Sequence, residues 1–284
     1  FNIVNYIILT VVVICVAYPL YFIVIASISD PTYVGTGLVW LWPKGLTFNG
    51  YKRIIADQRI CIGYKNTVLY AFLGTSINLA LTMSAAYSLY RKEFFGRNLI
   101  MGILIFTMFF NGGLIPTYLL VKKLGMIDTV WAMIIPNAVG VWNIIVTRTF
   151  YQTNIPLELQ EAAFIDGCSN TRFFLRVVLP LSKAVIAVMI LFYGVGHWNA
   201  FFNALIYLRQ KNLYPLQVIL RDILIQSQLQ QEMLYDIDGL VEQQKVSELI
   251  KYGVIIVSSL PLLILYPILQ KYFVKGVMVG AIKG

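Results

Sequence analysis

Residue types that perform chemistry are few in this chain of 284 residues, and none stands in a catalytic spacing. His197 is the single histidine, and the sequence lacks a Gly-x4-Gly-Lys-Ser/Thr, a His-Glu-x-x-His and a Gly-x-Ser-x-Gly pattern. Cys15, Cys61 and Cys168 share no close spacing, so we expect buried structural cysteines rather than a metal or redox site. We therefore expect no catalytic site, metal or cofactor on this chain.

The most informative polar pattern lies between residues 156 and 183. Pro156 suits the first position of a helix, and Glu158 and Glu161 fall in its first turns, where the helix dipole favours acidic side chains. Gly167 can supply the left-handed residue that ends this helix. The pattern predicts a short, capped helix that is exposed to water.

A second short helix is predicted to follow directly. Ser169 or Asn170 can cap it, it runs through residues 172–176, and Leu179-Pro180 stops it. On physical grounds alone, this helix–turn–helix is either a docking element for another protein or an ordinary amphipathic linker.

Composition indicates that the rest of the chain is a membrane protein. Apolar residues make up 59% and charged residues only 12%, whereas soluble domains have about a quarter charged residues. The net charge is +9, but Lys and Arg lie between apolar runs instead of clustering on one surface. They are therefore expected to flank membrane spans, and nucleic-acid binding is not expected.

Six uncharged runs are long enough to cross a bilayer as helices. The predicted spans are residues 3–28, 66–90, 98–121, 129–147, 184–208 and 252–270. We expect an all-α membrane protein with a single transmembrane domain over residues 1–284. Because none of the runs contains Asp, Glu, Lys or Arg, a proton- or ion-coupled carrier is disfavoured.

Basic residues give the orientation of these spans. Residues 91–97, 148–183 and the tail 271–284 hold ten of the 22 Lys and Arg, at a higher density than the longer segments opposite. The positive-inside rule therefore predicts that these segments and both termini are cytoplasmic. Residues 209–251 then form an extracytoplasmic loop, which contains a helical pattern over 215–231.

The polar helix–turn–helix resembles the EAA loop of permease subunits in ABC importers, commonly Glu-Ala-Ala-x3-Gly-x9-Ile-x-Leu-Pro. The residues at these spacings are Glu161, Ala162, Ala163, Gly167, Val177, Leu179 and Pro180, and Asp166-Gly167 is also usual in the carbohydrate branch of the family. Cys168 and Ala184 depart from the common Ala and Pro. The resemblance implies the type I importer permease fold, with a coupling helix at 157–165 that docks on a cytoplasmic ATPase.

Other stretches resemble the carbohydrate branch of this family, of the maltose-type, MalG-like kind. They are residues 66–67, 198–199 and 270–284, while 109–118 and 196–205 resemble a narrower oligosaccharide branch common in Gram-positive bacteria. The resemblance implies a bacterial cytoplasmic membrane, a second homologous permease, an extracytoplasmic solute-binding protein and a pair of ATPases that hold ATP and Mg. The chain itself is then a transport subunit and not an enzyme.

Two further sets of residues follow from the resemblance. In maltose-type importers the loop before the last span reaches the binding protein, so we expect Pro215, Leu216 and Arg221 to contact it. Sugars need aromatic stacking and amide or hydroxyl hydrogen bonds, which polar and aromatic residues of the spans can supply. The candidate solute-pathway residues are Asn111, Trp142, Asn143, His197, Trp198, Asn199 and Asn203. The same residues can instead serve helix packing or interfacial anchoring.

Three alternatives stay open. The same importer class can move another small solute, such as a polyol or glycerol phosphate, although the spans show no basic cluster for a phosphate. A stand-alone carrier or channel would transport without partners, and the chain has no filter-like repeat. A membrane receptor or scaffold would need no ATPase-docking element.

Overall fold

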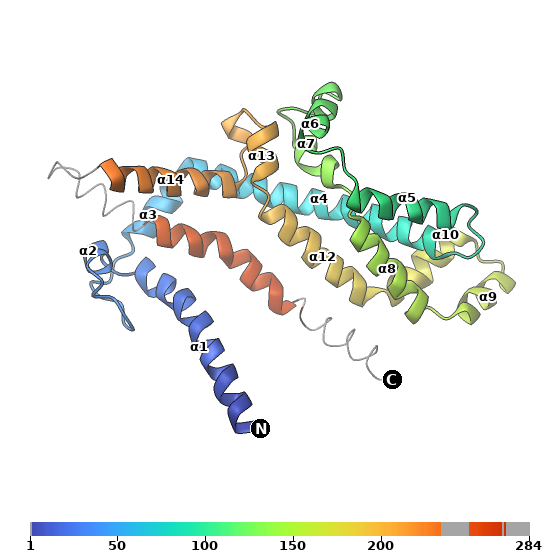
Figure 1. Cartoon of the computed structure of the whole chain (residues 1–284), viewed down its shortest axis with the longest axis horizontal. Helices are drawn as coiled ribbons and strands as arrows, with labels where there is room; N and C mark the ends of the chain where they lie inside the picture. Colours follow the sequence, from blue (N-terminus) through green and yellow to red (C-terminus); the bar gives the residue numbers. More distant parts are fainter. Residues whose placement is uncertain (1, 234–249, 269, 271–284) are drawn as a thin grey trace. The chain divides into compact units, whose positions relative to one another are not determined.

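The computed structural model describes residues 2–233, 250–268 and 270, and the regular elements in this part of the chain are all helices (Figure 1). The chain divides into two compact units, one of residues 1–64 with 215–263 and one of residues 65–214 with 264–284. The predicted tail 271–284 lies outside the described residues, as does the polar stretch that follows the helix predicted in the extracytoplasmic loop.

Three helices are each long and apolar enough to cross a membrane, namely α1 (Asn2–Ser27), α4 (Gln58–Tyr90) and Ile250–Ile268. At 1.5 Å per residue, α1 is about 39 Å long, more than the ~30 Å bilayer core. Three helix pairs pass the same test only when both members are taken together. They are α5 (Arg97–Phe109) with α6 (Leu114–Lys123), bent by 115°, Val130–Asn137 with α8 (Val141–Asn154), bent by 53°, and Asn170–Leu181 with α12 (Lys183–Trp198), bent by 81°. By length and composition, the described residues hold three to six candidate spans.

Residues that disfavour continuous helix stand at two of these bends. Between α5 and α6, the Asn111 side chain accepts a hydrogen bond from the Gly113 N–H at 2.9 Å, and Gly113 has a φ of 82°. Ahead of α8, the 3₁₀ turn η1 (Ile135–Asn137) contains Pro136, which cannot donate a backbone hydrogen bond. The runs predicted at 98–121 and 129–147 are therefore broken rather than straight.

The run predicted at 184–208 differs most from the structure. Helix α12 ends at Trp198, and a separate helix, α13 (Phe202–Tyr207), follows. The Asn199 side-chain amide donates to the Val195 carbonyl at 3.1 Å. Asn side chains compete in this way with the helical backbone, which explains why an uncharged run does not continue as one helix.

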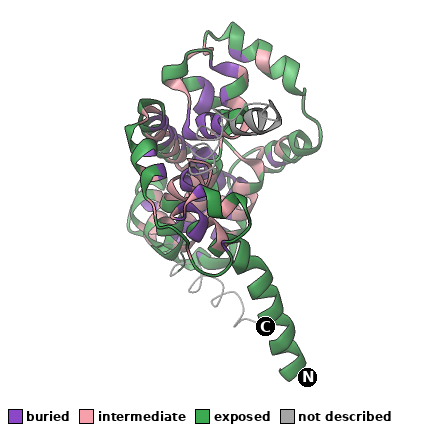
Figure 2. Ribbon diagram, turned by 90° about the vertical axis from the view of Figure 1, so that its left-hand side faces the viewer, coloured by how far each residue is buried: buried purple, intermediate pink, exposed green. Residues whose placement is uncertain are grey.

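The first unit contains α1 and residues 250–263 of the helix Ile250–Ile268. Its remaining elements are the start of α4, α2 (Pro31–Gly35), α3 (Asn49–Ala56) and α14 (Leu216–Met233). The rings of Phe22 and Tyr252 meet edge to face with centroids 6.1 Å apart, and the Tyr64 hydroxyl donates to the Val257 carbonyl at 3.2 Å. Helix α1 buries only its last three residues, as Figure 2 shows by its almost uniform exposure.

This exposure corrects the expectation of buried cysteines. Cys15 on α1 and Cys61 on α4 are exposed, and only Cys168 is half-buried. On α1, the reason is that the apolar side chains face outward rather than into a core of this chain.

The core of the second unit surrounds the C-terminal half of α4. Buried side chains from α4, α8, α12 and the segment between α9 and α12 form one cluster, which includes Met83, Tyr87, Tyr151, Phe173 and Met189. The short elements of this unit are α7 (Val130–Ile134), α9 (Leu157–Ile165), α10 (Asn170–Phe173), η2 (Phe174–Val178), α11 (Leu179–Leu181), α13 and η3 (Lys211–Leu213). The cluster ties the polar helix–turn–helix directly to the spans.

Candidate functional site

The predicted helix, turn and second helix are present at residues 157–178. Pro156 has a ψ of 142° and lies just before the helix rather than at its first position, and α9 spans Leu157–Ile165, the bounds predicted for it. The helix ends at Ile165, and Gly167, two residues later, has a φ of 72°. Hydrogen bonds from the Gly167 N–H to the Phe164 carbonyl (3.0 Å) and from the Cys168 N–H to the Ala163 carbonyl (2.9 Å) form a Schellman motif.

The second helix starts where predicted but ends later. The Ser169 hydroxyl accepts the Arg172 N–H at 3.3 Å, which caps α10. The helix then widens into the π-helical η2 and continues through Pro180 in α11, so Leu179-Pro180 does not stop it. The Ser182 hydroxyl donates to the Val178 carbonyl at 2.6 Å, and the 81° bend into α12 follows.

Most of the EAA-like residues, on α9 and in the segment after it, are exposed. The exposed members are Glu161, Ala162, Asp166, Gly167 and Pro180, while Ala163 and Leu179 are half-buried. Ile165 is 87% exposed, although it is a large apolar residue at the end of the helix. The opposite face is fixed, because Gln160 is only 4% exposed. This surface combines acidic, small and apolar side chains, as expected of a face that another protein covers.

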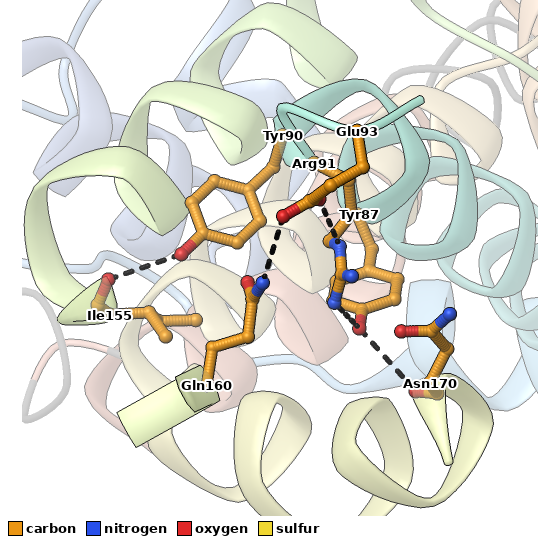
Figure 3. Close-up of polar contacts among 7 residues, drawn as sticks. All are labelled: Tyr87, Tyr90, Arg91, Glu93, Ile155, Gln160 and Asn170. Atoms are coloured by element: carbon orange, nitrogen blue, oxygen red, sulfur yellow. Dashed lines mark hydrogen bonds and ion pairs between the residues drawn. The ribbon is translucent and has the colours of Figure 1, made fainter. Parts of the chain in front are cut away.

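Arg91, the first residue after α4, holds α9 in this orientation (Figure 3). Its guanidinium forms an ion pair with Glu93 (3.1 Å), donates to the Tyr87 hydroxyl (3.3 Å) and lies over the Phe164 ring, 4.9 Å from the centroid. The Glu93 carboxylate also accepts from the Gln160 side chain at 3.4 Å. Gln160 and Phe164, one turn apart on α9, are therefore both attached to residues at the end of α4.

Two tyrosines on the last turn of α4 extend this attachment. The Tyr87 hydroxyl donates to the Asn170 carbonyl at 3.4 Å, and the Tyr90 hydroxyl donates to the Ile155 carbonyl at 3.3 Å (Figure 3). The Tyr87 ring also packs on Phe174, with centroids 4.8 Å apart. The tyrosines thus contact the chain on both sides of α9.

The two charged side chains at this junction differ in how far they are exposed to solvent. Arg91 is nearly buried, with 11% of its side chain exposed, whereas Glu93 is 61% exposed. A hydrogen bond from its own backbone N–H, followed by the Arg91 guanidinium, lowers the pKa of Glu93 below its ordinary value. Glu93 therefore remains ionised, and its ion pair intact, throughout the neutral range.

A second polar arrangement lies at the break between η1 and α8. His197 Nε2 is 2.7 Å from Asn78 Oδ1, and the Asn78 side-chain amide donates to the Asn137 carbonyl at 2.7 Å. Because the Asn78 NH₂ faces a carbonyl, its oxygen faces His197, and Nε2 must carry the proton. Only Nδ1 of the imidazole is then left as an acceptor.

A second set of hydrogen bonds, one helical turn from His197 and Asn78, stabilises the same break between η1 and α8. The Tyr193 hydroxyl is 2.6 Å from the Thr82 hydroxyl and accepts the Gly140 N–H at 3.3 Å. Tyr193 and His197, like Asn78 and Thr82, are four residues apart and share a helix face. Side chains of α4 and α12 therefore satisfy backbone groups that the break releases, as a membrane interior requires.

Gly74 allows α12 to approach α4 closely at His197. A Cβ atom at position 74 would overlap Nε2 and Cε1 of the imidazole. The hydrogen bond between His197 and Asn78 thus depends on a glycine one turn away on the same helix.

A cavity of about 310 Å³ opens at this break. It is lined by Met133, Asn137, Val139, Gly140, Phe192, Tyr193, Gly196, His197, Ala200 and Asn203. Of the predicted solute-pathway residues, His197 and Asn203 meet here, and the Asn143 amide lies beside Gly140.

The other predicted solute-pathway residues are placed elsewhere. Asn111 shapes the α5–α6 turn, Asn199 bonds its own helix, Trp142 is 60% exposed, and Trp198 is buried. Sequence reasoning missed Asn78, Asn137 and Tyr193. A polar amide inside an apolar run, as at Asn78, was the available signal.

The residues expected to contact a binding protein lie at the start of α14. Pro215 and Leu216 are buried, and the backbone of Leu216 packs against Gly63. Arg221 is exposed. Burial leaves Arg221 as the member of this set whose side chain can reach another protein.

Broken apolar helices and a polar cavity at one of the breaks are features of a helical membrane permease. The chain belongs to the family described as binding-protein-dependent transport system inner membrane component, whose model matches residues 78–279. It is a permease subunit of an ABC importer.

Similar proteins cover nearly the whole chain. It is 39% identical to Protein LplC of Bacillus subtilis (strain 168), over 94% of this chain and 89% of that protein. It is 37% identical to the polygalacturonan/rhamnogalacturonan transport system permease protein YtcP of the same organism, over 95% and 93%. A crystal structure of a bacterial ABC transporter involved in the import of the acidic polysaccharide alginate matches with a TM-score of 0.87 and 31% identity, covering 96% of both chains.

Proposed function

We propose that this chain is one permease subunit of an ATP-driven importer for a carbohydrate, and specifically for an oligosaccharide. The substrate class is supported by the relative named for polygalacturonan and rhamnogalacturonan and by the alginate importer. In this proposal each bent helix pair is one span, which makes six, and both termini are cytoplasmic. ATP and Mg bind to a partner ATPase, and a second homologous permease completes the pathway.

The observation that carries the proposal is the exposed face of α9. On this face Glu161, Ala162 and Ile165 project from a helix whose other face is anchored through Gln160 and Phe164. Ile165 lies near the exposed Glu161 and Ala162, so this face of α9 offers apolar, small and acidic groups to a partner protein. We assign α9 as the coupling helix and the ATPase dimer as that partner.

Transport would then proceed by alternating access. When ATP binding closes the ATPase dimer, α9 moves as a lever and displaces the end of α4, to which Arg91 and Tyr87 attach it. The spans then open outward and receive solute from an extracytoplasmic binding protein, with Arg221 on α14 as a contact. Hydrolysis resets the permease, and no chemical step takes place on this chain.

The experiment that tests this proposal is affinity purification of the tagged subunit from native membranes, followed by mass spectrometry. The wild type is expected to bring down an ATPase and a second permease, and a Glu161→Lys/Gly167→Pro variant is expected to lose the ATPase. Asp222→Lys, a charge reversal at an exposed carboxylate of α14, is the matched control and should retain it. If the wild type recovers no ATPase in mild detergent, α9 is not a coupling helix.

A further inference from the structure

The cavity at the break between η1 and α8 has the size and lining of a ligand site. Its volume of about 310 Å³ lies at the lower end of the roughly 300–1,000 Å³ that is usual for small-molecule pockets. The wall combines the polar groups of His197, Asn137 and Asn203 with the rings of Phe192 and Tyr193. Aromatic rings cover apolar surface, and amide and imidazole groups bind hydroxyls. A sugar ring presents both kinds of surface.

Gly196 keeps this space open at a cost to its own helix. A glycine inside a helix is less stable than alanine by about 0.5–1 kcal/mol. At Gly196 a Cβ atom would meet no other atom within 4 Å, so close packing does not require glycine there. Gly74, in contrast, is needed for the approach of His197. A side chain added at position 196 would enter the cavity.

The polar groups of the wall are not all needed to hold the break together. The Asn137 carbonyl and the Gly140 N–H already have partners in Asn78 and Tyr193. With Nε2 of His197 bonded to Asn78, Nδ1 is the ring nitrogen left to accept a hydrogen bond. The amide of Asn203 can both donate and accept. Hydroxyl groups, which also do both, match this set.

The lining further selects against charged ligands. None of its ten residues is Asp, Glu, Lys or Arg. Burying a carboxylate or a phosphate without a cation is strongly unfavourable. We propose that this cavity is a subsite for one neutral sugar unit of the transported carbohydrate. The inference rests on the proposed carbohydrate import, and it goes further by assigning a binding site, and its preference for uncharged rings, to this subunit.

The test compares two glycines in the importer reconstituted with its ATPase, second permease and binding protein. Gly196→Leu fills the cavity. Gly102→Leu, on α5, is the matched control, because a Cβ at Gly102 also meets nothing within 4 Å and Gly102 does not line the cavity. The probes are labelled maltotriose, galactotriose, arabinotriose and trigalacturonate. For the neutral sugars that the wild type imports, Gly196→Leu should lower ATP-dependent uptake by about tenfold or more, and Gly102→Leu should leave it unchanged.

Each failure has a separate meaning. If the wild type imports none of the four sugars with ATP, the proposed function itself is wrong. If it imports them and Gly196→Leu equals Gly102→Leu, only the subsite is wrong. If Gly196→Leu no longer co-purifies with the second permease, the cavity receives that protein rather than a sugar, and the inference is overturned.

A second variant tests the preference for uncharged rings. Asn203→Lys places a cation in the wall, so the ratio of trigalacturonate uptake to neutral trisaccharide uptake should rise relative to the wild type. The binding protein is the same in both measurements, so its own selectivity cancels. An unchanged ratio would contradict the assignment of a neutral sugar.

Discussion

The Arg91 guanidinium carbon lies 4.9 Å from the centroid of the Phe164 ring, which places the last turn of α9 against the end of α4. Helix α4 continues without interruption from this junction back to Thr82 and Asn78, the residues that bond to α12. The twelve residue-to-residue steps from Tyr90 to Asn78 correspond to about 18 Å of helix. A single rigid element therefore joins the docking helix to the cavity, so a displacement of α9 can reach the break between η1 and α8.

Replacing Arg91 is expected to uncouple transport from ATP hydrolysis. In Arg91→Lys the charge stays, but the planar group that contacts Phe164, Tyr87 and Glu93 is lost. Loss of a guanidinium hydrogen bond costs about 0.5–1.5 kcal/mol, so sugar transported per ATP should fall by about 2- to 12-fold. The measurement is the ratio of uptake to phosphate release in proteoliposomes. Lys92→Ala, an exposed neighbour, is the control, and an equal ratio in both variants would rule out this role.

The left-handed turn at Gly167 is expected to tolerate few substitutions. With φ at 72°, a Cβ atom there costs about 1–2 kcal/mol, and Asn tolerates this conformation better than Ala. Thermal unfolding of the purified subunit should therefore rank wild type above Gly167→Asn and Gly167→Asn above Gly167→Ala. ATPase co-purification should follow the same order. The reverse order for Asn and Ala would show that the turn is not held in this conformation.

The helix–turn–helix was predictable because its signals are local. Glu158, Gly167 and Ser169 act within a few residues of their own positions, through the helix dipole, the left-handed turn and the N-cap. The end at Pro180 was predicted wrongly, because proline disfavours only a regular α-helix, and here a π-helical turn precedes it.

Only some of the residues at the cavity could be predicted from the sequence, because they come from segments that are far apart in the chain. Asn78 and His197 are 119 residues apart, and one sequence gives no information about which polar residues of different spans pair. The breaks in the spans carried a visible signal in Asn111-Gly112-Gly113 and in Pro136. Each uncharged run was nevertheless predicted as a single span, since hydropathy reports membrane depth and not where a helix bends.

The junction between Glu93 and α9 should be insensitive to pH until the solution is strongly acidic. The pKa of Glu93 is lowered in the folded protein, so its contribution to stability is present above the ordinary Glu pKa and is lost as the pH falls through the lowered one. Amide hydrogen exchange of α9, corrected for intrinsic rates, should stay constant from about pH 5 to 8 and rise only below the ordinary value of about 4.3. Glu93→Gln should remove that rise, and a rise near pH 6 would contradict the assignment.

Gly74 and Gly194 offer a matched test of the contact between α4 and α12. In Gly74→Ala the new methyl group overlaps the His197 ring, whereas in Gly194→Ala the nearest atom, Thr75 Oγ1, is at an ordinary 3.8 Å. Displacing His197 strains the packing and leaves Asn78 without its partner, so Gly74→Ala should destabilise the subunit by about 1–3 kcal/mol. Gly194→Ala should be neutral or stabilising. Thermal unfolding in detergent measures both, and equal melting temperatures would show that the two helices do not approach closely at Gly74.

Arg221 is expected to act at the outer face through its charge rather than through packing. It is exposed on α14, whereas its neighbour Leu216 is fully buried. Arg221→Gln should therefore leave the melting temperature and the basal ATPase rate unchanged. The concentration of binding protein needed for half-maximal ATPase stimulation should rise up to about fivefold, since exposed charges contribute roughly 0.2–1 kcal/mol. Because salt screens exposed charges, the difference should shrink at high ionic strength. Arg53→Gln, exposed on α3, serves as the control, and an equal shift in both variants would indicate a general effect of net charge rather than a contact at Arg221.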